Sequence, residues 1–405
     1  MHNRYEKTLA WMYKQLPMFQ KQGNIALNNK LDNSLHFCEY LGNPEKTFKM
    51  IHVAGTNGKG SVSHIMASVL QEAGYRTGLF SSPHLKDFRE RIKINGKEVP
   101  ENYVVNFVEK NKSFLESHHF SFFEMTTVMA FAYFAHTRVD IAVIETGLGG
   151  RLDSTNVITP ELSVITNIGF DHMDILGATL PKIAFEKAGI IKPGVPVVLG
   201  EYHPETWPVF KEKAAGEKAP LLQAASVPDQ PYETDLKGAY QKTNIHTAVT
   251  ALKALPGFTI SEASIERGLL RVAANTGLKG RWQQLGTNPL IICDVAHNAN
   301  GFEVIVEQIK AQKYKKLYMV LGMVKEKDLN TILPLFPKEA IYYFCKPDIA
   351  RGLDATLLKE KASEYDLLGE VFGSVTAAYN QALKNAQKDD FIYVGGSTFT
   401  VAEII

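Results

Sequence analysis

Short, continuous apolar runs rich in β-branched residues recur along this chain, and they constrain its fold more than any other feature. A strand exposed on one face alternates apolar and polar residues, whereas these runs do not. They therefore indicate strands covered on both faces, as in a parallel sheet flanked by helices. Helical patterns such as 61–73 and 102–117 separate the runs and give repeated βα units. The predicted strands are 48–53, 77–80, 141–144, 163–166, 195–199, 290–293, 317–321, 341–344 and 391–394.

The chain is long enough for two domains, with 405 residues. The glycine-containing stretch 276–280 follows a helical segment and precedes a fresh series of strands, so we predict domains of 1–279 and 280–405. Scattered prolines among polar residues in the region 200–240 indicate an irregular or inserted connection rather than a domain end.

Charge and cysteine content exclude several classes of protein. The 44 basic residues nearly balance the 43 acidic ones, so we expect neither nucleic acid nor a membrane as a partner. Cys38, Cys293 and Cys345 are too few and too far apart for a disulfide framework or a zinc knuckle. Residues 1–19 lack the apolar core of a signal peptide, and no run of about 18 apolar residues occurs. A soluble cytoplasmic protein is expected.

A glycine-rich loop follows the first predicted strand and opens a helix. It reads Ala54-Gly55-Thr56-Asn57-Gly58-Lys59-Gly60-Ser61. Glycines let backbone N–H groups approach an anion, the helix N-terminus adds partial positive charge, and lysine neutralises phosphate oxygens. The loop departs from the standard P-loop, because Gly60 separates Lys59 from Ser61. The sequence therefore predicts a phosphate-binding loop of a variant kind.

Two further strands end in polar residues that suit a metal ion. Glu145 closes the apolar run 141–144, and Asp171, His172 and Asp174 follow the run 163–166. In open α/β sheets the ligand crevice lies at the carboxyl ends of the strands. A carboxylate there is placed to hold Mg²⁺ against nucleotide phosphates. The alternatives are a helix-capping role for Glu145 and a structural role for His172.

Other candidate residues carry weaker signals when each is taken alone. Lys187 belongs to a Glu-Lys pair at a helix end, which usually faces solvent. Arg281 lies in the linker, where a surface arginine and a phosphate-binding arginine are both compatible with the pattern. Asp294 and His297 follow the predicted strand 290–293.

These segments, in this order and spacing, resemble the folylpolyglutamate synthase and dihydrofolate synthase family, within the wider group of amide-forming Mur ligases. The resemblance implies an α/β fold, with an N-terminal P-loop-type ATPase domain on a mostly parallel sheet. It implies a smaller C-terminal Rossmann-like α/β domain as well. The matching stretches are 55–61, 81–85, 122–126, 145–156, 171–180, 183–192, Asn244, 280–281, 294–298 and 395–397.

The resemblance also implies a role for each matching residue. It places Asn57, Gly58, Lys59, Gly60 and Ser61 on the ATP phosphates. Two Mg²⁺ ions are implied, one held by Ser82 and Glu145 and the other by His172. Lys187 matches a lysine that the wider group often carries as a carbamate, which turns a repelled cation into an anion able to approach Mg²⁺.

Nucleotide and substrate contacts follow from the same resemblance. Asn244, Arg281 and Asp294 would hold the nucleotide, and His297 would lie near the incoming glutamate or the nucleotide. A further group would border the pterin-bearing substrate; its members are Ser82, Pro83, His84, Leu85, Phe122, Phe123 and Asp153. For the two phenylalanines, packing in the core is an equal alternative.

The implied reaction is ATP-dependent addition of L-glutamate to tetrahydrofolate, to dihydropteroate, or to both, through an acyl phosphate. Lys59, Lys187, His172, Arg281 and His297 would be its catalytic residues, in a monomer that closes by rotation near 276–280. Two other readings stay open. A Mur-type cell-wall ligase normally has an additional N-terminal domain, for which Gly55 lies too near the start. A nucleotide-binding switch without ligase activity would not need the second and third strand-end segments.

Overall fold

The computed structural model describes residues 2–17, 31–226 and 231–405, and its contacts divide the chain into two compact units. The first unit comprises 1–235 and 242–278, and the second comprises 236–241 and 279–405. The six-residue segment 236–241 thus packs with the second unit although both of its flanks belong to the first. The boundary that we placed between residues 279 and 280 stays a prediction.

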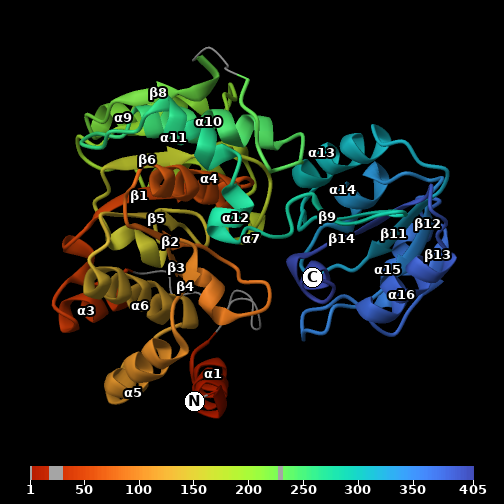
Figure 1. The fold of residues 1–405 in the computed structure, drawn as a ribbon, viewed down its shortest axis with the longest axis horizontal. Helices are drawn as coiled ribbons and strands as arrows, with labels where there is room; N and C mark the ends of the chain where they lie inside the picture. Colours follow the sequence, from red (N-terminus) through yellow and green to blue (C-terminus); the bar gives the residue numbers. More distant parts are fainter. Residues whose placement is uncertain (1, 18–30, 227–230) are drawn as a thin grey trace. The chain divides into compact units, whose positions relative to one another are not determined.

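An eight-stranded sheet forms the centre of the first unit, in the order β4-β3-β2-β5-β1-β6-β7-β8 (Figure 1). Along this order, every neighbouring pair from β2 across to β8 is parallel. The pairs β2 with β3 and β3 with β4 are antiparallel. The fold is therefore a mostly parallel α/β sheet, as the sequence predicted. The strands are β1 (Lys49–Ala54), β2 (Thr77–Phe80), β3 (Ile92–Ile94), β4 (Lys97–Glu98), β5 (Ile141–Glu145), β6 (Leu162–Ile165), β7 (Val197–Leu199) and β8 (Leu221–Gln223).

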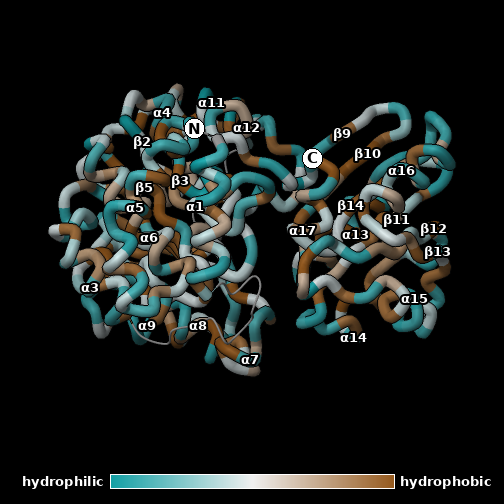
Figure 2. The backbone as a smooth tube through the Cα atoms, turned by 90° about the horizontal axis from the view of Figure 1, so that it is seen from below, coloured by the Kyte–Doolittle hydropathy of each residue, from teal (hydrophilic) through white to brown (hydrophobic). Residues whose placement is uncertain are grey.

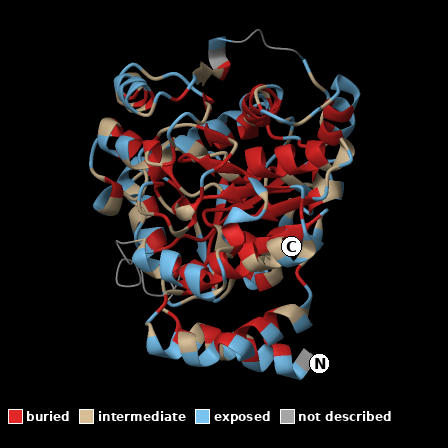
Figure 3. Cartoon of the chain, turned by 90° about the vertical axis from the view of Figure 1, so that its left-hand side faces the viewer, coloured by how far each residue is buried: buried red, intermediate tan, exposed pale blue. Residues whose placement is uncertain are grey.

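The continuous apolar runs form strands that are buried on both faces, as their lack of polar residues predicted. Every residue of β5 and β6 is buried, as is every residue of β1 after Lys49. Figure 3 shows the buried sheet with helices on its outside. The helices of this unit are α1 (His2–Gln15), α3 (Asp32–Tyr40), α4 (Lys59–Glu72), α5 (Glu101–Ser117), α6 (Phe122–Thr137), α7 (Met173–Leu176), α8 (Leu180–Ala188), α9 (Trp207–Gly216), α10 (Gln241–Lys253), α11 (Glu262–Leu269) and α12 (Val272–Thr276), with 3₁₀ turns η2 (Pro44–Lys46), η3 (Phe88–Arg91), η4 (Ser154–Val157) and η5 (Ala224–Ser226).

Two apolar clusters hold six of these helices, α1, α3, α5, α6, α8 and α9, to the sheet. The larger one joins α1, α3, α5 and α6 to the strands through side chains such as Phe37, Phe131 and Ile144. The other joins α8 and α9 to them through residues such as Ala184 and Phe210. Ser121 fixes the start of α6 with a capping box, because its hydroxyl accepts the Glu124 N–H while the Glu124 carboxylate accepts the Ser121 N–H.

The region 200–240 is more regular than its prolines suggested. It contains α9, β8 and η5, and residues 227–230, with Pro228, lie outside the described part of the chain. Pro208 occupies the first turn of α9, where a missing N–H is tolerated because no carbonyl would have accepted it. No helix among the described residues is long and apolar enough to cross a membrane.

The second unit is built on a six-stranded sheet in the order β13-β12-β11-β14-β10-β9. Its pairs are parallel except for β9 with β10. The apolar strand β10 runs brown in Figure 2, as does much of β5 in the first unit. The strands are β9 (Gln283–Thr287), β10 (Leu290–Cys293), β11 (Leu317–Leu321), β12 (Ile341–Phe344), β13 (Gly369–Val371) and β14 (Phe391–Gly395), and the helices are α13 (Ala299–Lys310), α14 (Leu329–Ile332), α15 (Ala355–Ser363), α16 (Val375–Asn385) and α17 (Thr398–Ala402), with the 3₁₀ turn η6 (Leu333–Leu335).

Candidate functional site

The glycine-rich loop connects the end of β1 directly to the start of α4. Gly58 is the N-cap of this helix and has a φ of 83°, and Gly55 has a φ of 149°. Both lie in the region that side chains disfavour, so the turn depends on glycine at these two positions. Gly60 and Ser61 are buried in the first turn, and Asn57 and Lys59 are half-buried. The loop therefore presents the N-terminus of a 14-residue helix, which favours an anion.

The segment after β6 holds this loop in place. Thr56 N donates to Asn167 O at 2.9 Å, and Asn57 N donates to Asn167 Oδ1 at 2.9 Å. The Thr166 hydroxyl donates to Asn57 O at 2.6 Å, and Gly169 N donates to Thr56 Oγ1 at 3.0 Å. We had interpreted 166–174 only as a source of metal ligands. Its first residues also fix the backbone of the phosphate loop, and the metal-ligand role of Asp171, His172 and Asp174 stays a prediction.

Asn244 approaches the same loop from α10. It is buried, and its Oδ1 lies 2.4 Å from where a Cβ on Gly58 would be. The structure thus brings Asn244 to the loop with which it was grouped as a nucleotide-binding residue. Whether it contacts a nucleotide stays a prediction.

Two lysines meet at one carbonyl oxygen of the loop. Lys59 Nζ donates to Gly55 O at 2.9 Å and to Thr56 O at 3.1 Å, and Lys187 Nζ donates to the same Gly55 O at 2.8 Å. Lys187 is buried near the end of α8, so it does not lie on a solvated face. Burial, and secondarily repulsion by Lys59, lower the pKa of Lys187 from its ordinary 10.5 to about 7. This amine is therefore substantially neutral at physiological pH.

The lowered pKa of Lys187 predicts a distinct pH dependence of stability. Between about pH 7 and 10.5 the unfolded chain keeps the proton on this amine and the folded chain has released it. Unfolding then takes up a proton, so the free energy of unfolding rises with pH, by up to about 1.4 kcal/mol per pH unit. We expect a Lys187→Met variant to lack this rise when urea unfolding is followed across the window in CO₂-free buffer. An exposed-lysine variant, Lys46→Met, should keep the wild-type slope; equal slopes in all three proteins would contradict the assignment.

Glu145 and Ser82 lie at neighbouring strand ends beside the loop. Glu145 is buried as the last residue of β5 and pairs in register with Val53 of β1. Ser82 follows β2, and its N–H donates to Glu145 Oε2 at 3.3 Å. The carboxylate is thus held at the sheet edge next to the phosphate loop, and the structure brings these two predicted metal ligands together.

His172 lies in the loop after β6, at the N-cap of α7, with 29% of its side chain exposed. Its Nε2 is 3.8 Å from Asp171 Oδ2. Within residues 2–17, 31–226 and 231–405, no group of three or more His, Cys, Asp or Glu side chains is arranged to enclose a metal ion. A divalent ion here would have to take most of its ligands from phosphates and water, which is how Mg²⁺ is usually held.

The residues expected around the pterin-bearing substrate form a second cluster near Glu145. Pro83 is exposed, and His84 is half-buried. Arg91 Nε donates to His84 Nδ1 at 2.7 Å, and burial together with the Arg91 charge lowers the pKa of His84 to about 3. The guanidinium of Arg91 lies 5.3 Å from the ring centre of Phe122. Sequence reasoning missed Arg91, although the Asp-x-x-Glu capping signal of 87–90 marks the turn that carries it.

Burial differs among three residues that were expected near the substrate, Phe122, Phe123 and Asp153. Phe122 is a core residue with 2% exposure, whereas Phe123 is partly buried and packs 5.8 Å from the ring of Phe80. Asp153 is buried and caps η4. Core packing therefore accounts for Phe122, and Phe123 keeps a surface that a ligand can reach.

In the second unit, the predicted residue Asp294 is buried and directly follows β10. Its Oδ2 accepts the Tyr240 hydroxyl and the Trp282 N–H, both at 2.6 Å, and its Oδ1 accepts Ala296 N at 2.8 Å. These three donors all come from the chain itself, so Asp294 fixes the backbone on either side of it. Arg281 lies directly before Trp282, and His297 Nδ1 is 3.0 Å from Val295 O.

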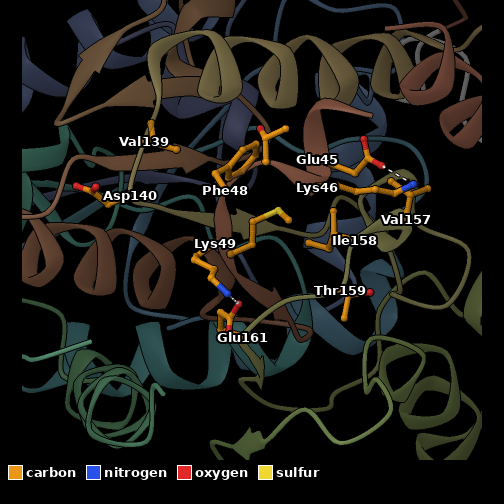
Figure 4. A pocket seen from close by; sticks show the side chains of 12 residues that line it. Glu45, Lys46, Phe48, Lys49, Val139, Asp140, Val157, Ile158, Thr159 and Glu161 are labelled. Carbon is orange, nitrogen blue, oxygen red and sulfur yellow. Dashed lines mark hydrogen bonds and ion pairs between the residues drawn. The ribbon is translucent and has the colours of Figure 1, made fainter. Parts of the chain in front are cut away.

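A separate groove lies at the amino ends of the strands, away from the phosphate loop. It has a volume of about 590 Å³ and runs past the start of β1, where Lys49 pairs with Glu161 (Figure 4). Phe48 and Ile158 contribute apolar surface to it. Because β1 enters at the groove and ends at the phosphate loop, the groove is no part of the phosphate and metal cluster.

Comparison with known proteins identifies both halves of the chain. Residues 53–199 match the Mur ligase middle domain, and residues 280–398 match the Mur ligase, glutamate ligase domain. The dihydrofolate synthase/folylpolyglutamate synthase of Escherichia coli is 34% identical over 371 residues, covering 87% of this chain and 85% of that protein. A probable bifunctional folylpolyglutamate synthase/dihydropteroate synthase of Haloferax volcanii is 32% identical over 398 residues, covering 90% of this chain; this chain spans 46% of its length.

Solved structures of the same family have folds similar to this chain. Escherichia coli FolC in complex with DHPP and ADP has a TM-score of 0.86 at 30% identity, covering 98% of this chain and 96% of that one. A bifunctional folylpolyglutamate synthase/dihydrofolate synthase with Mn, AMPPNP and L-glutamate bound has a TM-score of 0.85 at 28% identity, covering 98% and 97%. Neither a cell-wall ligase nor a switch protein is supported by these relatives. The chain belongs to the folylpolyglutamate synthase/dihydrofolate synthase family of the Mur ligase superfamily, and it is an ATP-dependent ligase.

Proposed function

We propose that this ligase uses ATP and Mg²⁺ to join L-glutamate to the carboxylate of tetrahydrofolate and to that of dihydropteroate, releasing ADP and phosphate. The observation that carries the proposal is the meeting of Lys59 and Lys187 at Gly55 O, next to the strand-end carboxylate of Glu145. Relatives with bound DHPP, ADP, AMPPNP, Mn and L-glutamate support these substrates and a divalent ion.

A carboxylate and an amine do not condense at neutral pH, because the carboxylate is a poor electrophile. In the proposed reaction a carboxylate oxygen of the pterin substrate attacks the γ-phosphorus of ATP and ADP leaves. The neutral glutamate amine then attacks the acyl carbon of the resulting acyl phosphate, phosphate leaves with the bonding electron pair, and the nitrogen releases one proton as the amide forms. The chain itself contributes positioning and electrostatics rather than a covalent intermediate.

Each group of residues has a part in this proposal. The loop 57–61 binds the ATP phosphates, where the α4 N-terminus and Lys59 stabilise the charge that develops on the transferring phosphoryl group. Ser82 and Glu145 would hold one Mg²⁺ and His172 a second, and these ions supply further neutralisation of phosphate charge. Lys59, Lys187, His172, Arg281 and His297 are the proposed catalytic set.

We also propose roles for the remaining predicted residues in binding the nucleotide, the glutamate and the pterin substrate. Asn244 and Arg281 bind the nucleotide, and His297 lies near the glutamate or the nucleotide. Asp294 was expected on the nucleotide; its three bonds within the chain favour a role in holding the segments of Arg281 and His297. Residues 82–85, Phe123 and Asp153 border the pterin substrate. We propose a cytoplasmic monomer; the buried, free Cys38, Cys293 and Cys345 suit a reducing compartment.

Lys187 is proposed to carry a carbamate. Carbon dioxide adds only to a neutral amine, and the pKa of about 7 makes the neutral form abundant. Protein equilibrated with ¹³C-bicarbonate should therefore show a carbamate carbon resonance that a Lys187→Met variant lacks. Lys192 is a matched control, because burial lowers its pKa too and its Nζ donates to Asn156 O. A signal that survives in Lys187→Met and disappears in Lys192→Met would overturn the assignment.

Mass spectrometry of the product tests the function directly. Folded protein receives ATP, Mg²⁺ and glutamate, with dihydropteroate in one tube and a tetrahydrofolate monoglutamate in another. One added glutamate in both tubes, with ADP formed, is the expected result. An adduct in only one tube would restrict the substrate class, and no adduct in either would refute the proposed function.

A further inference from the structure

A chain of hydrogen bonds inside the first unit links His52 of β1 to Asp153. His52 is fully buried, and its Nε2 lies 2.8 Å from Thr155 Oγ1. Thr155 Oγ1 in turn lies 2.5 Å from Asp153 Oδ1, which also accepts Thr155 N at 3.0 Å. None of the roles proposed above uses His52 or Thr155.

The direction of these hydrogen bonds follows from the chemistry of the three groups. A carboxylate only accepts, so the Thr155 hydroxyl donates to Asp153, and it must then accept from His52 Nε2–H. Burial lowers the pKa of His52 to about 3, so the ring is neutral and carries a single N–H. His52 Nδ1, also buried, has no hydrogen-bond partner, which agrees with a ring protonated on Nε2. The side chains of His52 and Thr155 thus hold one carboxylate oxygen in one orientation.

The other carboxylate oxygen holds the loop that follows Glu145. Asp153 Oδ2 accepts Leu148 N at 2.8 Å. A Cβ on Gly147 would lie 2.6 Å from Cζ of Phe123, so this loop presses against the ring proposed to border the substrate.

The same loop also contacts the end of α8 that carries Lys187. A Cβ on Gly150 would lie 2.9 Å from the carbonyl oxygens of Glu186 and Lys187, and Arg151 N donates to Glu186 O at 2.7 Å. The Asp153 carboxylate therefore helps to fix the position of a loop that contacts both Phe123 and α8.

We propose that His52 and Thr155 are positioning residues for the pterin-bearing substrate, acting through Asp153 and the loop 146–152. The inference rests on the proposed function, in which Asp153 and Phe123 border that substrate. It predicts a selective defect, because the phosphate loop is held separately, by Thr166 and Asn167.

The test compares Thr155→Val, which removes the hydroxyl at nearly constant volume, with Thr155→Ser, which keeps it. We expect the valine variant to raise the KM for dihydropteroate by about tenfold or more, the order of the loss in affinity or activity when a hydrogen-bond partner behind a metal ligand is removed. The KM values for ATP and glutamate should stay within about twofold of wild type, and serine should restore the KM for dihydropteroate. His52→Met, which removes the Nε2–H donor, should show the same selective defect and gives a second reading if the valine variant is unstable.

Ser163→Ala is the matched control. Ser163 is buried in β6 beside His52 in the strand register, but its hydroxyl donates to Ile190 O, away from Asp153. It should leave all three KM values unchanged even if it lowers the melting temperature. The proposal is overturned if Thr155→Val leaves the KM for dihydropteroate unchanged, if all three KM values rise together, or if Ser163→Ala reproduces the selective defect. Wild-type protein that forms no glutamate adduct would instead refute the proposed function, and binding of dihydropteroate without turnover, followed by its fluorescence, would still measure the positioning effect.

Discussion

Replacing Lys59 with alanine is expected to abolish glutamate transfer while leaving the protein folded. In the proposed function its ammonium binds the ATP phosphates, and removing one such preorganised group costs at least about a hundred- to a thousandfold in rate. The side chain is half-buried and donates hydrogen bonds to two loop carbonyls, so stability should change little. Product mass spectrometry and thermal unfolding of the same preparations measure both effects.

The control for Lys59→Ala is Lys46→Ala. Lys46 is 72% exposed in η2, at the amino ends of the strands, and its nearest carboxylate is 3.9 Å away. It should turn over at the wild-type rate. If Lys59→Ala formed product as fast as Lys46→Ala, the phosphate loop would have been assigned wrongly.

The second large effect is expected from Gly55→Ala, which should destabilise the first unit as well as abolish activity. The new Cβ would lie 1.8 Å from Thr166 Oγ1 and 3.1 Å from the Thr166 backbone nitrogen, at a φ of 149° that alanine rarely adopts. Overpacking and backbone strain together cost roughly 2–5 kcal/mol. Loss of the bond from Thr166 to Asn57 O would also release the loop. We expect the melting temperature to fall by about 10 °C.

Gly216→Ala provides the comparison, because Gly216 is an exposed residue in the last turn of α9 with nothing within 4 Å of its added Cβ. Alanine should be neutral there or stabilise by about 0.5–1 kcal/mol, since it favours helix and restricts the unfolded chain. Equal melting temperatures for the two variants would show that the close contact with Thr166 is relieved at little cost.

The sequence located the buried strands well because their signal is local and strong. A run such as 141–144 can only be satisfied by burial on both faces, and β5 is buried at every residue. The strands at the sheet edges, and β3 next to an edge, were missed because they lack such a run. Strand β3 alternates isoleucine with Lys93, and β9 is largely polar and half-exposed. Lys93 is nevertheless buried, because its Nζ donates to Thr276 O at 2.8 Å, a contact 183 positions away that no local pattern reveals.

The same distinction applies to the site. Lys59 and Glu145 were predictable because they follow apolar strands, and the carboxyl ends of parallel strands share one edge of a sheet. Arg91, Thr166 and Thr155 were not singled out, since their roles depend on partners distant in sequence or on their exact orientation. Lys187 had the local pattern of a solvated helix end, and only its similarity to a family motif marked it as a candidate, near an expected Mg²⁺. Its contact with Gly55 O of the glycine-rich loop was found only in the structure.

The segment 236–241 limits how this protein can be divided into separate fragments. The backbone passes between the two units after residues 235, 241 and 278, so no single cut yields two fragments that each retain all of their own residues. A recombinant fragment that began at residue 280 would lack Tyr240, the hydroxyl donor to Asp294, and Ala239, whose N–H donates to Gln308 Oε1 at 2.7 Å. Split-reporter or fragment-complementation designs should therefore graft this hexapeptide onto the C-terminal half, or place the break inside a surface loop of one unit.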